Sequence, residues 1–248
     1  MLWIEGHPAV EGLAHPTALP DAARDVLGAV AEAGFPLGRD GGVGRADGTV
    51  TLGFEDRKKG IAVLQGVAAL DFPRSIPVVY GRPPQTVYIA GERSAKRLAR
   101  CYDKGLESLS APPGALVRFE NQVRYTKDTR RAVEEVDLAH VRHRYRARFE
   151  PLAKSAAGVT VASLPVLAAR VADQVERGLM RYQEAERALG FLALHSAGPA
   201  RGLPGRTMRR RRAELRDHGL VLADDFFEPV EVNLGDTFEA ALEAWSDG

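Results

Sequence analysis

The sequence lacks several features that would each point to a particular class of protein. Its 248 residues include a single cysteine, Cys101, so an intramolecular disulfide is excluded. No apolar run approaches the roughly 18 residues of a membrane-spanning helix. The first residues also lack the basic region and apolar stretch of a signal peptide. These absences favour a cytoplasmic protein with no membrane partner.

Charge is unevenly distributed, although the net charge is only +1. The segment Ala223–Gly248 has eight acidic residues and no Lys or Arg. Positive charge is concentrated instead at Arg142–Arg148 and at Arg206–Arg216. Basic clusters of this kind suggest an anionic partner. The alternative is that each cluster is an ordinary solvated helix face.

The first part of the chain predicts an α+β fold, in which an antiparallel sheet has helices on one face. Strands are expected where β-branched and apolar residues alternate with polar ones between turn residues. These segments are Arg45–Gly53, Pro77–Tyr80, Thr86–Ala90, Arg97–Lys104 and Leu116–Tyr125. An edge strand at Leu2–Glu5 and a helix beginning after Asp21 are also expected. Whether the apolar segment Ile61–Leu70 is a helix or a strand is left open.

The remainder of the chain has helical periodicity. Helices are predicted over Val136–Lys154, over Ala162–Leu194 as one or two helices, and over Thr207–His218. The chain is therefore expected to divide into an α+β domain at 1–135 and a helical region at 136–248.

The last predicted helix places Arg209, Arg212 and Arg216 along one stripe. Short apolar segments that read as a β-ribbon follow it, so residues 183–232 resemble a winged helix-turn-helix. Such a helix can enter the major groove of DNA and direct its arginines to phosphates and guanines. A solvated amphipathic helix is the alternative interpretation.

Tyr102 is the most informative residue of the predicted sheet. Side chains alternate between the two faces of a strand, so Arg100, Tyr102 and Lys104 should share one face. The same alternation in two other strands adds further polar side chains to the exposed face: Arg45, Asp47, Arg118, Glu120 and Arg124. Any half-exposed sheet carries charge on its outer face, which is the alternative interpretation.

The chemical mix of this face suits phosphoryl transfer. Asp47 and Glu120 can hold a hard divalent cation such as Mg²⁺, which polarises a phosphoryl oxygen. A phenol has a pKa of about 10, so attack by Tyr102 requires positive charge that favours phenolate. Arg100, Lys104 and the cation are predicted to supply this charge.

Four segments carry a resemblance to the replication initiation factor family, which comprises rolling-circle initiators of plasmids and filamentous phages and related relaxases. They follow one another in the family's order, as an R-x-D strand, a Y-x-G-S-type segment, an R-x-Y-D-K strand and an R-x-E strand. Here they are Val43–Asp47, Thr86–Gly91 with Ser94, Arg100–Lys104 and Leu116–Glu120. Where the family often has Gly-Ser-Arg, this chain has Gly-Glu-Arg-Ser.

The resemblance implies a DNA-nicking enzyme. Tyr102 would attack a phosphodiester, forming a 5′-phosphotyrosyl link and a free 3′-OH, with Arg100 and Lys104 stabilising charge. Asp47 and Glu120 would position Mg²⁺ or Mn²⁺. DNA contacts are predicted for eight arginines: Arg45, Arg118, Arg124, Arg142, Arg144, Arg209, Arg212 and Arg216.

The expected partner is origin DNA, single-stranded or in a hairpin, with a host helicase and a homodimer as further candidates. The rival hypothesis is a non-enzymatic DNA-binding regulator that uses the basic helix near the C-terminus.

Overall fold

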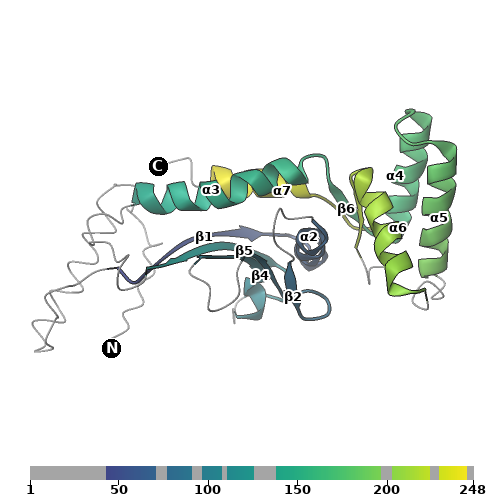
Figure 1. Cartoon of the computed structure of the whole chain (residues 1–248). Coiled ribbons are helices and arrows are strands. Elements are labelled where there is room, and N and C mark those ends of the chain that lie inside the picture. Colours follow the sequence, from purple (N-terminus) through teal and green to yellow (C-terminus); the bar gives the residue numbers. More distant parts are fainter. Residues whose placement is uncertain are drawn as a thin grey trace, which may run out of the picture.

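The computed structural model describes residues 43–70, 77–90, 97–107, 111–125, 138–196, 203–223 and 229–244. The elements expected at Leu2–Glu5 and after Asp21 lie outside these residues. The fold is α+β, as predicted: a five-stranded antiparallel sheet is covered on one face by helices, and a lobe of three further helices follows (Figure 1).

The five strands of the sheet lie in the order β1-β5-β4-β3-β2, and all pair antiparallel. Their bounds are β1 Arg45–Gly53, β2 Val78–Tyr80, β3 Thr86–Ala90, β4 Arg97–Asp103 and β5 Leu116–Arg124. All five predicted strands are confirmed. However, β4 ends one residue earlier than expected, because the 3-10 helix η1 begins there (Lys104–Leu106).

The apolar stretch Ile61–Leu70, which the sequence did not assign to a helix or a strand, belongs mostly to helix α2 (Arg57–Ala69). Asp56 caps its first turn, because its carboxylate accepts a hydrogen bond from the backbone N–H of Lys58 at 2.8 Å. A Cβ on Gly60 would overlap the carbonyl oxygen of Gly114, so only glycine lets α2 approach the turn before β5 this closely.

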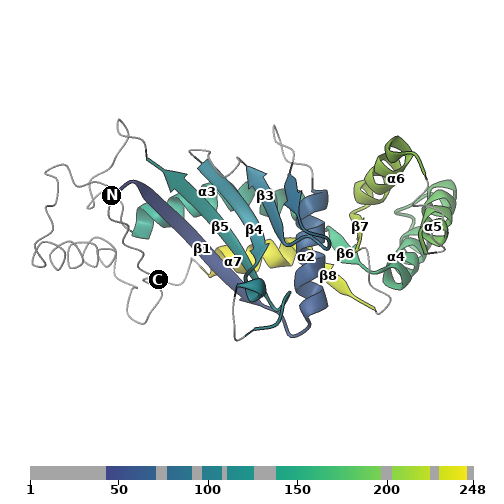
Figure 2. The same cartoon turned by 90° about the horizontal axis from the view of Figure 1, so that it is seen from below.

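Two helices from the C-terminal half lie side by side on the same face of the sheet: α3 (Leu138–Ala156) and α7 (Leu234–Glu243) (Figures 1 and 2). Phe119 of β5 packs edge-to-face on Phe149 and Phe238, with ring centroids 6.0 Å and 5.5 Å apart. Asn233 caps α7, a helix that the periodicity of the sequence did not predict.

These contacts correct the predicted boundary at residue 135. Helices α3 and α7 share one hydrophobic core with the five-stranded sheet, so they belong to the α+β unit. A second core is confined to residues between Ala162 and Leu222. The helical lobe is therefore an insertion between α3 and α7 rather than the whole of residues 136–248.

A small three-stranded sheet joins the two cores. The prediction that a β-ribbon follows the basic helix is wrong, because the strands after that helix do not pair with each other. Strand β6 (Thr160–Ala162) lies between β7 (Leu220–Leu222), to which it is parallel, and β8 (Glu231–Asn233), to which it is antiparallel. Strands β7 and β8 consequently do not form the hairpin of a winged helix. Gly158, with φ +72°, and the β-branched residues after it explain why β6 is a strand and not part of a helix.

The helical lobe consists of α4 (Leu164–Glu176), α5 (Tyr182–Ser196) and α6 (Gly205–Asp217). Arg216 of α6 donates a hydrogen bond to the carbonyl oxygen of Ala69, at the end of α2, over 2.7 Å. This bond ties the lobe to the α+β unit. Within the described part of the chain, no helix combines the length and the apolar character that crossing a membrane requires.

Candidate active site on the open face of the sheet

Figure 2 views the sheet from the face opposite α3 and α7, which we call the open face. The strand pairing places most of the predicted polar side chains on this face. Tyr102 of β4 lies directly opposite Arg118 of β5, and Arg100 lies opposite Glu120. Asp47 of β1 lies opposite Gln122, two residues along β5 from Glu120. Because directly opposed residues of an antiparallel pair project from the same face, the pairing confirms that Asp47, Glu120 and Tyr102 share one face.

Tyr102 lies between two guanidinium groups. The side chain is only 6% exposed, and the guanidinium carbon of Arg100 lies 4.6 Å from the centroid of its ring, within range of a cation–π interaction. Arg118 lies directly opposite Tyr102 on β5, where its charge acts on the phenol, and its Nε donates a hydrogen bond to Oγ1 of Thr51 at 2.9 Å. The cations nearest to the phenol therefore come from β4 and β5.

Lys104 does not belong to this group, and its predicted place on the face is wrong. It lies in η1, where the alternation of the strand has ended, and its Nζ bonds to Glu107 Oε2 at 2.6 Å. Arg118 takes the place beside the phenol that was predicted for Lys104. Arg118 is the arginine of the R-x-E segment, so the sequence already marked it as a residue of the site. Only the strand register shows that it lies opposite Tyr102.

The described side chains alone do not lower the pKa of the Tyr102 phenol below its ordinary value. Burial, followed by the negative charge of Glu120, raises the pKa of Tyr102 to about 12, whereas Arg118 and Arg100 act in the opposite direction. Desolvation disfavours the charged form of any acid. The phenol is consequently neutral at physiological pH, and reaction requires a base or a further cation near its oxygen.

Glu120 offers the clearest binding group of the face. It is 4% exposed, and its Oε2 accepts a hydrogen bond from Arg100 Nη2 at 3.0 Å. Its Oε1 is buried and has no hydrogen-bond partner among the described residues. A buried carboxylate oxygen without a partner is costly, so a ligand or cation at this position would relieve that cost.

Asp47 is held differently, because its two oxygens lie 2.9 Å and 2.8 Å from Nε of Arg45. It would have to exchange this ion pair for a metal. In the described parts of the chain, no group of three or more His, Cys, Asp or Glu side chains is arranged to hold a metal ion. Of the two predicted metal ligands, Glu120 therefore has one oxygen without a partner, whereas Asp47 is already paired.

Asp103 of the R-x-Y-D-K segment has a structural role. It points to the helix-covered face, where it is buried, and its Oδ2 accepts a hydrogen bond from the backbone N–H of Gly114 at 2.8 Å. This bond holds the connection between β4 and β5 against β4. The aspartate of the motif therefore positions Tyr102 indirectly, through the strand that carries it.

The eight arginines predicted to contact DNA do not form a single surface. Arg45, Arg118 and Arg124 lie on the open face of the sheet, where Arg124 donates to Gln122. Arg142 and Arg144 lie on α3, which packs against the other face. Of the three on α6, Arg209 and Arg212 are exposed, whereas Arg216 is half-buried and bonded to Ala69.

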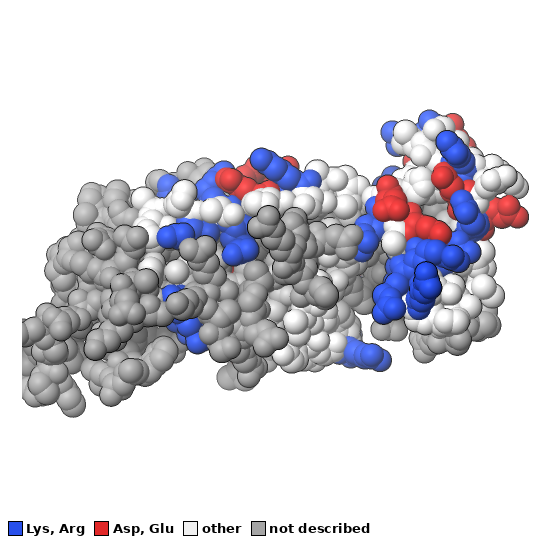
Figure 3. All heavy atoms as spheres, viewed as in Figure 1, with Lys and Arg blue, Asp and Glu red and all other residues white. Residues whose placement is uncertain are grey.

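Lys and Arg side chains gather over α6 and also along α3 in the space-filling view (Figure 3). The exposed arginines of α6 extend beyond the predicted stripe, since Arg206 and Arg210 are exposed as well. Arg210 and Arg211 share Glu214 as an ion-pair partner, at 3.8 Å and 2.7 Å. Helix α6 is therefore a basic surface of the lobe, separate from the face that carries Tyr102.

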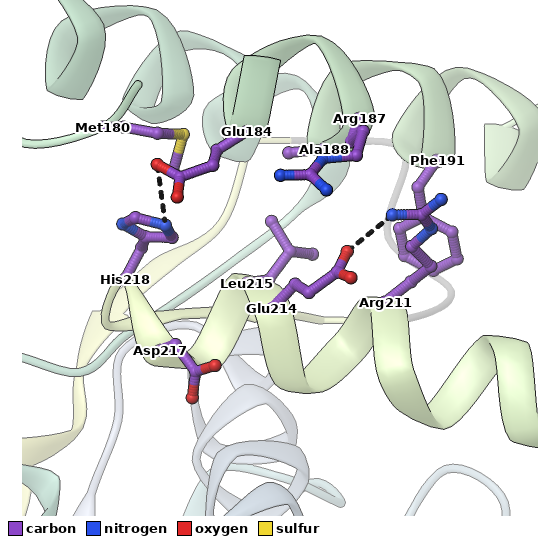
Figure 4. Close-up of a pocket in the computed structure, with 10 residues that line it drawn as sticks. All are labelled: Met180, Glu184, Arg187, Ala188, Phe191, Arg211, Glu214, Leu215, Asp217 and His218. Carbon is purple, nitrogen blue, oxygen red and sulfur yellow. Dashed lines mark hydrogen bonds and ion pairs between the residues drawn. The ribbon is translucent and has the colours of Figure 1, made fainter. Parts of the chain in front are cut away.

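A hollow of about 200 Å³ lies between α5 and α6 (Figure 4). Two pairs of its polar side chains meet: Glu214 with Arg211 within α6, and Glu184 of α5 with His218 at 3.8 Å. Phe191 and Leu215 supply apolar lining. Only the pair of Glu184 and His218 joins α5 to the end of α6, and none of the lining residues comes from the five-stranded sheet.

Alkaline pH is expected to destabilise the protein through Tyr102. Its pKa is about 12 in the folded chain and about 10 when unfolded, so the unfolded chain releases the proton first. The stabilisation is fully present below about pH 10 and is lost as the pH rises through about 12. The urea midpoint should therefore fall more steeply with pH in the wild type than in Tyr102→Phe. Equal slopes would contradict the assigned burial of this phenol.

Comparisons of the chain with protein-family models, with curated proteins and with solved structures found no match. A function has therefore to be inferred from the residues themselves and from their geometry.

Proposed function

We propose that the chain is a replication initiator or relaxase-like enzyme that nicks one strand of DNA with Tyr102 as the nucleophile. The observation that carries the proposal is the arrangement around Tyr102, which has Arg118 and Arg100 beside it and the unpartnered oxygen of Glu120 on the next strand. The order of the four segments that resemble the initiator family also supports it.

The proposed reaction is a transesterification. The phenol oxygen of Tyr102 attacks the phosphorus atom and gives up its proton, the new bond joins oxygen to phosphorus, and the bond from phosphorus to the 3′-oxygen breaks. That oxygen takes up a proton and becomes the free 3′-OH. Arg118 stabilises negative charge on the phenol oxygen and on the phosphate, because guanidinium groups bind phosphate oxygens in bidentate fashion.

Arg100 has a different task in this scheme. Its guanidinium lies over the ring of Tyr102 and is bonded to Glu120, so it fixes the ring and the carboxylate relative to one another. Side chains held by such neighbours lose less freedom when the reacting groups meet, which favours the oriented attack. Arg45 and Arg124 would guide the DNA strand along the same face.

A divalent cation, Mg²⁺ or Mn²⁺, fits the free oxygen of Glu120, with Asp47 as a second ligand once Arg45 moves to a phosphate. Carboxylate oxygens are the ligands that these hard cations prefer. When bound, the cation would polarise a phosphoryl oxygen and neutralise developing charge.

The metal proposal predicts that Glu120→Gln lowers the rate of adduct formation about 100-fold or more, because the amide cannot replace the charge that binds the cation. The labelled single-stranded origin should form a covalent protein adduct with the wild type in Mn²⁺, and EDTA should abolish it. Mn²⁺ should also raise the melting temperature of the wild type and not of Glu120→Gln.

Glu107→Gln is the matched control for this change. Glu107 is exposed and paired with Lys104, so its removal should alter neither the adduct rate nor the effect of Mn²⁺ on melting. Equal melting shifts in the wild type and in Glu120→Gln would contradict the assignment of Glu120 as a metal ligand.

A second candidate function is favoured by the four exposed arginines of α6: a DNA-binding regulator without catalytic activity. Phosphate contacts from such a helix give affinity for duplex DNA that falls with salt. A regulator would bind duplex DNA equally in EDTA and in Mn²⁺ and would form no adduct with any origin strand.

A further inference from the structure

The row of residues that contains Tyr102 continues to the edge of the sheet. Thr86 of β3 lies opposite Tyr102, and Tyr80 of the edge strand β2 lies opposite Thr86. All three therefore project from the same open face. Neighbouring strands are about 4.8 Å apart, so Tyr80 stands about 10 Å from Tyr102 along a line that crosses the strands.

Tyr80 is presented to solvent and held in a defined orientation. Its side chain is 54% exposed. One side of it meets Tyr88, which is buried on the same face, in an edge-to-face contact with centroids 5.6 Å apart and planes at 75°. An aromatic ring fixed on one side and open on the other loses little conformational freedom when a flat ligand covers it.

Two arginines lie near the two ends of this row of residues. Arg82 is exposed in the turn that follows β2, and Arg118 lies beyond Tyr102 in the same row. Among the described strand residues of the open face there are four arginines and two carboxylates: Arg45, Arg100, Arg118 and Arg124, with Asp47 and Glu120. Alternating aromatic and cationic groups along a track are the features that bind single-stranded nucleic acid.

We propose that Tyr80 is a stacking platform for an unpaired nucleobase of the single-stranded DNA that the open face binds. This inference rests on the proposed function, because it takes the DNA single strand as the occupant of the face. The strand would run across β2, β3 and β4, with a base on Tyr80, the backbone past Arg82 and Thr86, and the reacting phosphate at Tyr102 and Arg118.

The test measures binding apart from cleavage. In the Tyr102→Phe background with EDTA present, fluorescein-labelled oligo(dT) is titrated and its anisotropy followed. Replacing Tyr80 by Ala should weaken binding about 5- to 100-fold, since stacking of one base on an aromatic ring contributes about 1–3 kcal/mol. Tyr80→Phe and Tyr80→Trp should bind as tightly as the protein with Tyr80 intact, because the ring and not the hydroxyl makes the contact.

Val79→Ala is the matched control. Val79 is 41% exposed on the same edge strand, but the alternation of the strand directs it to the other face. Its replacement should leave the affinity unchanged. An oligonucleotide of the same length with abasic sugars should bind equally well to the protein with Tyr80 intact and to Tyr80→Ala, because no base remains to stack.

The outcomes separate this inference from the proposed function. If the Tyr102→Phe protein binds oligo(dT) and the added Tyr80→Ala change does not weaken binding, or if the Tyr102→Phe protein does not bind it at all, the stacking platform is refuted. If Tyr80→Ala weakens binding as expected but the wild type forms no adduct with any origin strand, the platform stands as a DNA-binding site and the nicking activity is refuted.

Discussion

Tyr102→Phe is expected to abolish the covalent adduct with single-stranded origin DNA and to leave the fold intact. The phenol oxygen is the atom that would join phosphorus, and no other group of the described open face combines a hydroxyl with two adjacent guanidinium groups. Phenylalanine fills the same space under Arg100. The adduct is measured as a band of reduced mobility on a denaturing gel, and the linked peptide is identified by mass spectrometry.

Tyr80→Phe provides the control for this experiment. It removes a phenol hydroxyl from the same face but at the exposed edge, and adduct formation should continue at the wild-type rate. Melting temperatures within a few degrees of one another would show that all three proteins are folded. An undiminished adduct in Tyr102→Phe would mean that another residue is the nucleophile or that the chain does not nick by this route.

The five-stranded sheet could be predicted because period-2 alternation and turn residues mark its strands separately. Residues such as Val117, Phe119 and Val123 alternate with polar or charged neighbours. The face of the sheet to which each side chain points was therefore evident without knowing which strands pair with β5. Strand β6 was missed, because three residues between two long helices give no alternation to count. Helix α7 was missed as well. It follows β8 directly, and its apolar residues can be recognised as core residues only once their contacts with the core that they share with α3 are known.

The shared face of Tyr102, Asp47 and Glu120 was predictable for the same reason, since alternation assigns each strand's residues to a face. The identity of the neighbours was not predictable, because it depends on register. A shift of β5 by two residues would place Glu120, and not Arg118, opposite Tyr102. The direction of the pKa shift of Tyr102 also required the structure, because the burial of the phenol depends on the packed face and not on the flanking residues in sequence.

Arg118→Ala is expected to slow adduct formation about 100- to 1,000-fold at saturating DNA, the usual effect of removing one preorganised donor to developing charge. Arg118 opposes the rise in the pKa of Tyr102, so its loss should raise that pKa further. The rate of the wild type should increase with pH as the phenolate fraction grows, and the profile of Arg118→Ala should be displaced to higher pH. Single-turnover rates measured from about pH 7 to about pH 12 record both effects, because a displaced profile differs from a uniform loss of rate only where the profile approaches its inflection.

Arg124→Ala separates this role from simple attraction of DNA. Arg124 lies on the same strand and the same face, but it is exposed at the end of β5 and bonded to Gln122 rather than to the phenol. Its loss should weaken DNA binding at low salt and leave the single-turnover pH profile unchanged, because a distant surface charge is screened by solvent ions. If Arg118→Ala behaves like Arg124→Ala, with weaker binding and an unmoved profile, Arg118 only attracts the strand. A displaced profile in Arg118→Ala alone assigns it to the phenol oxygen of Tyr102.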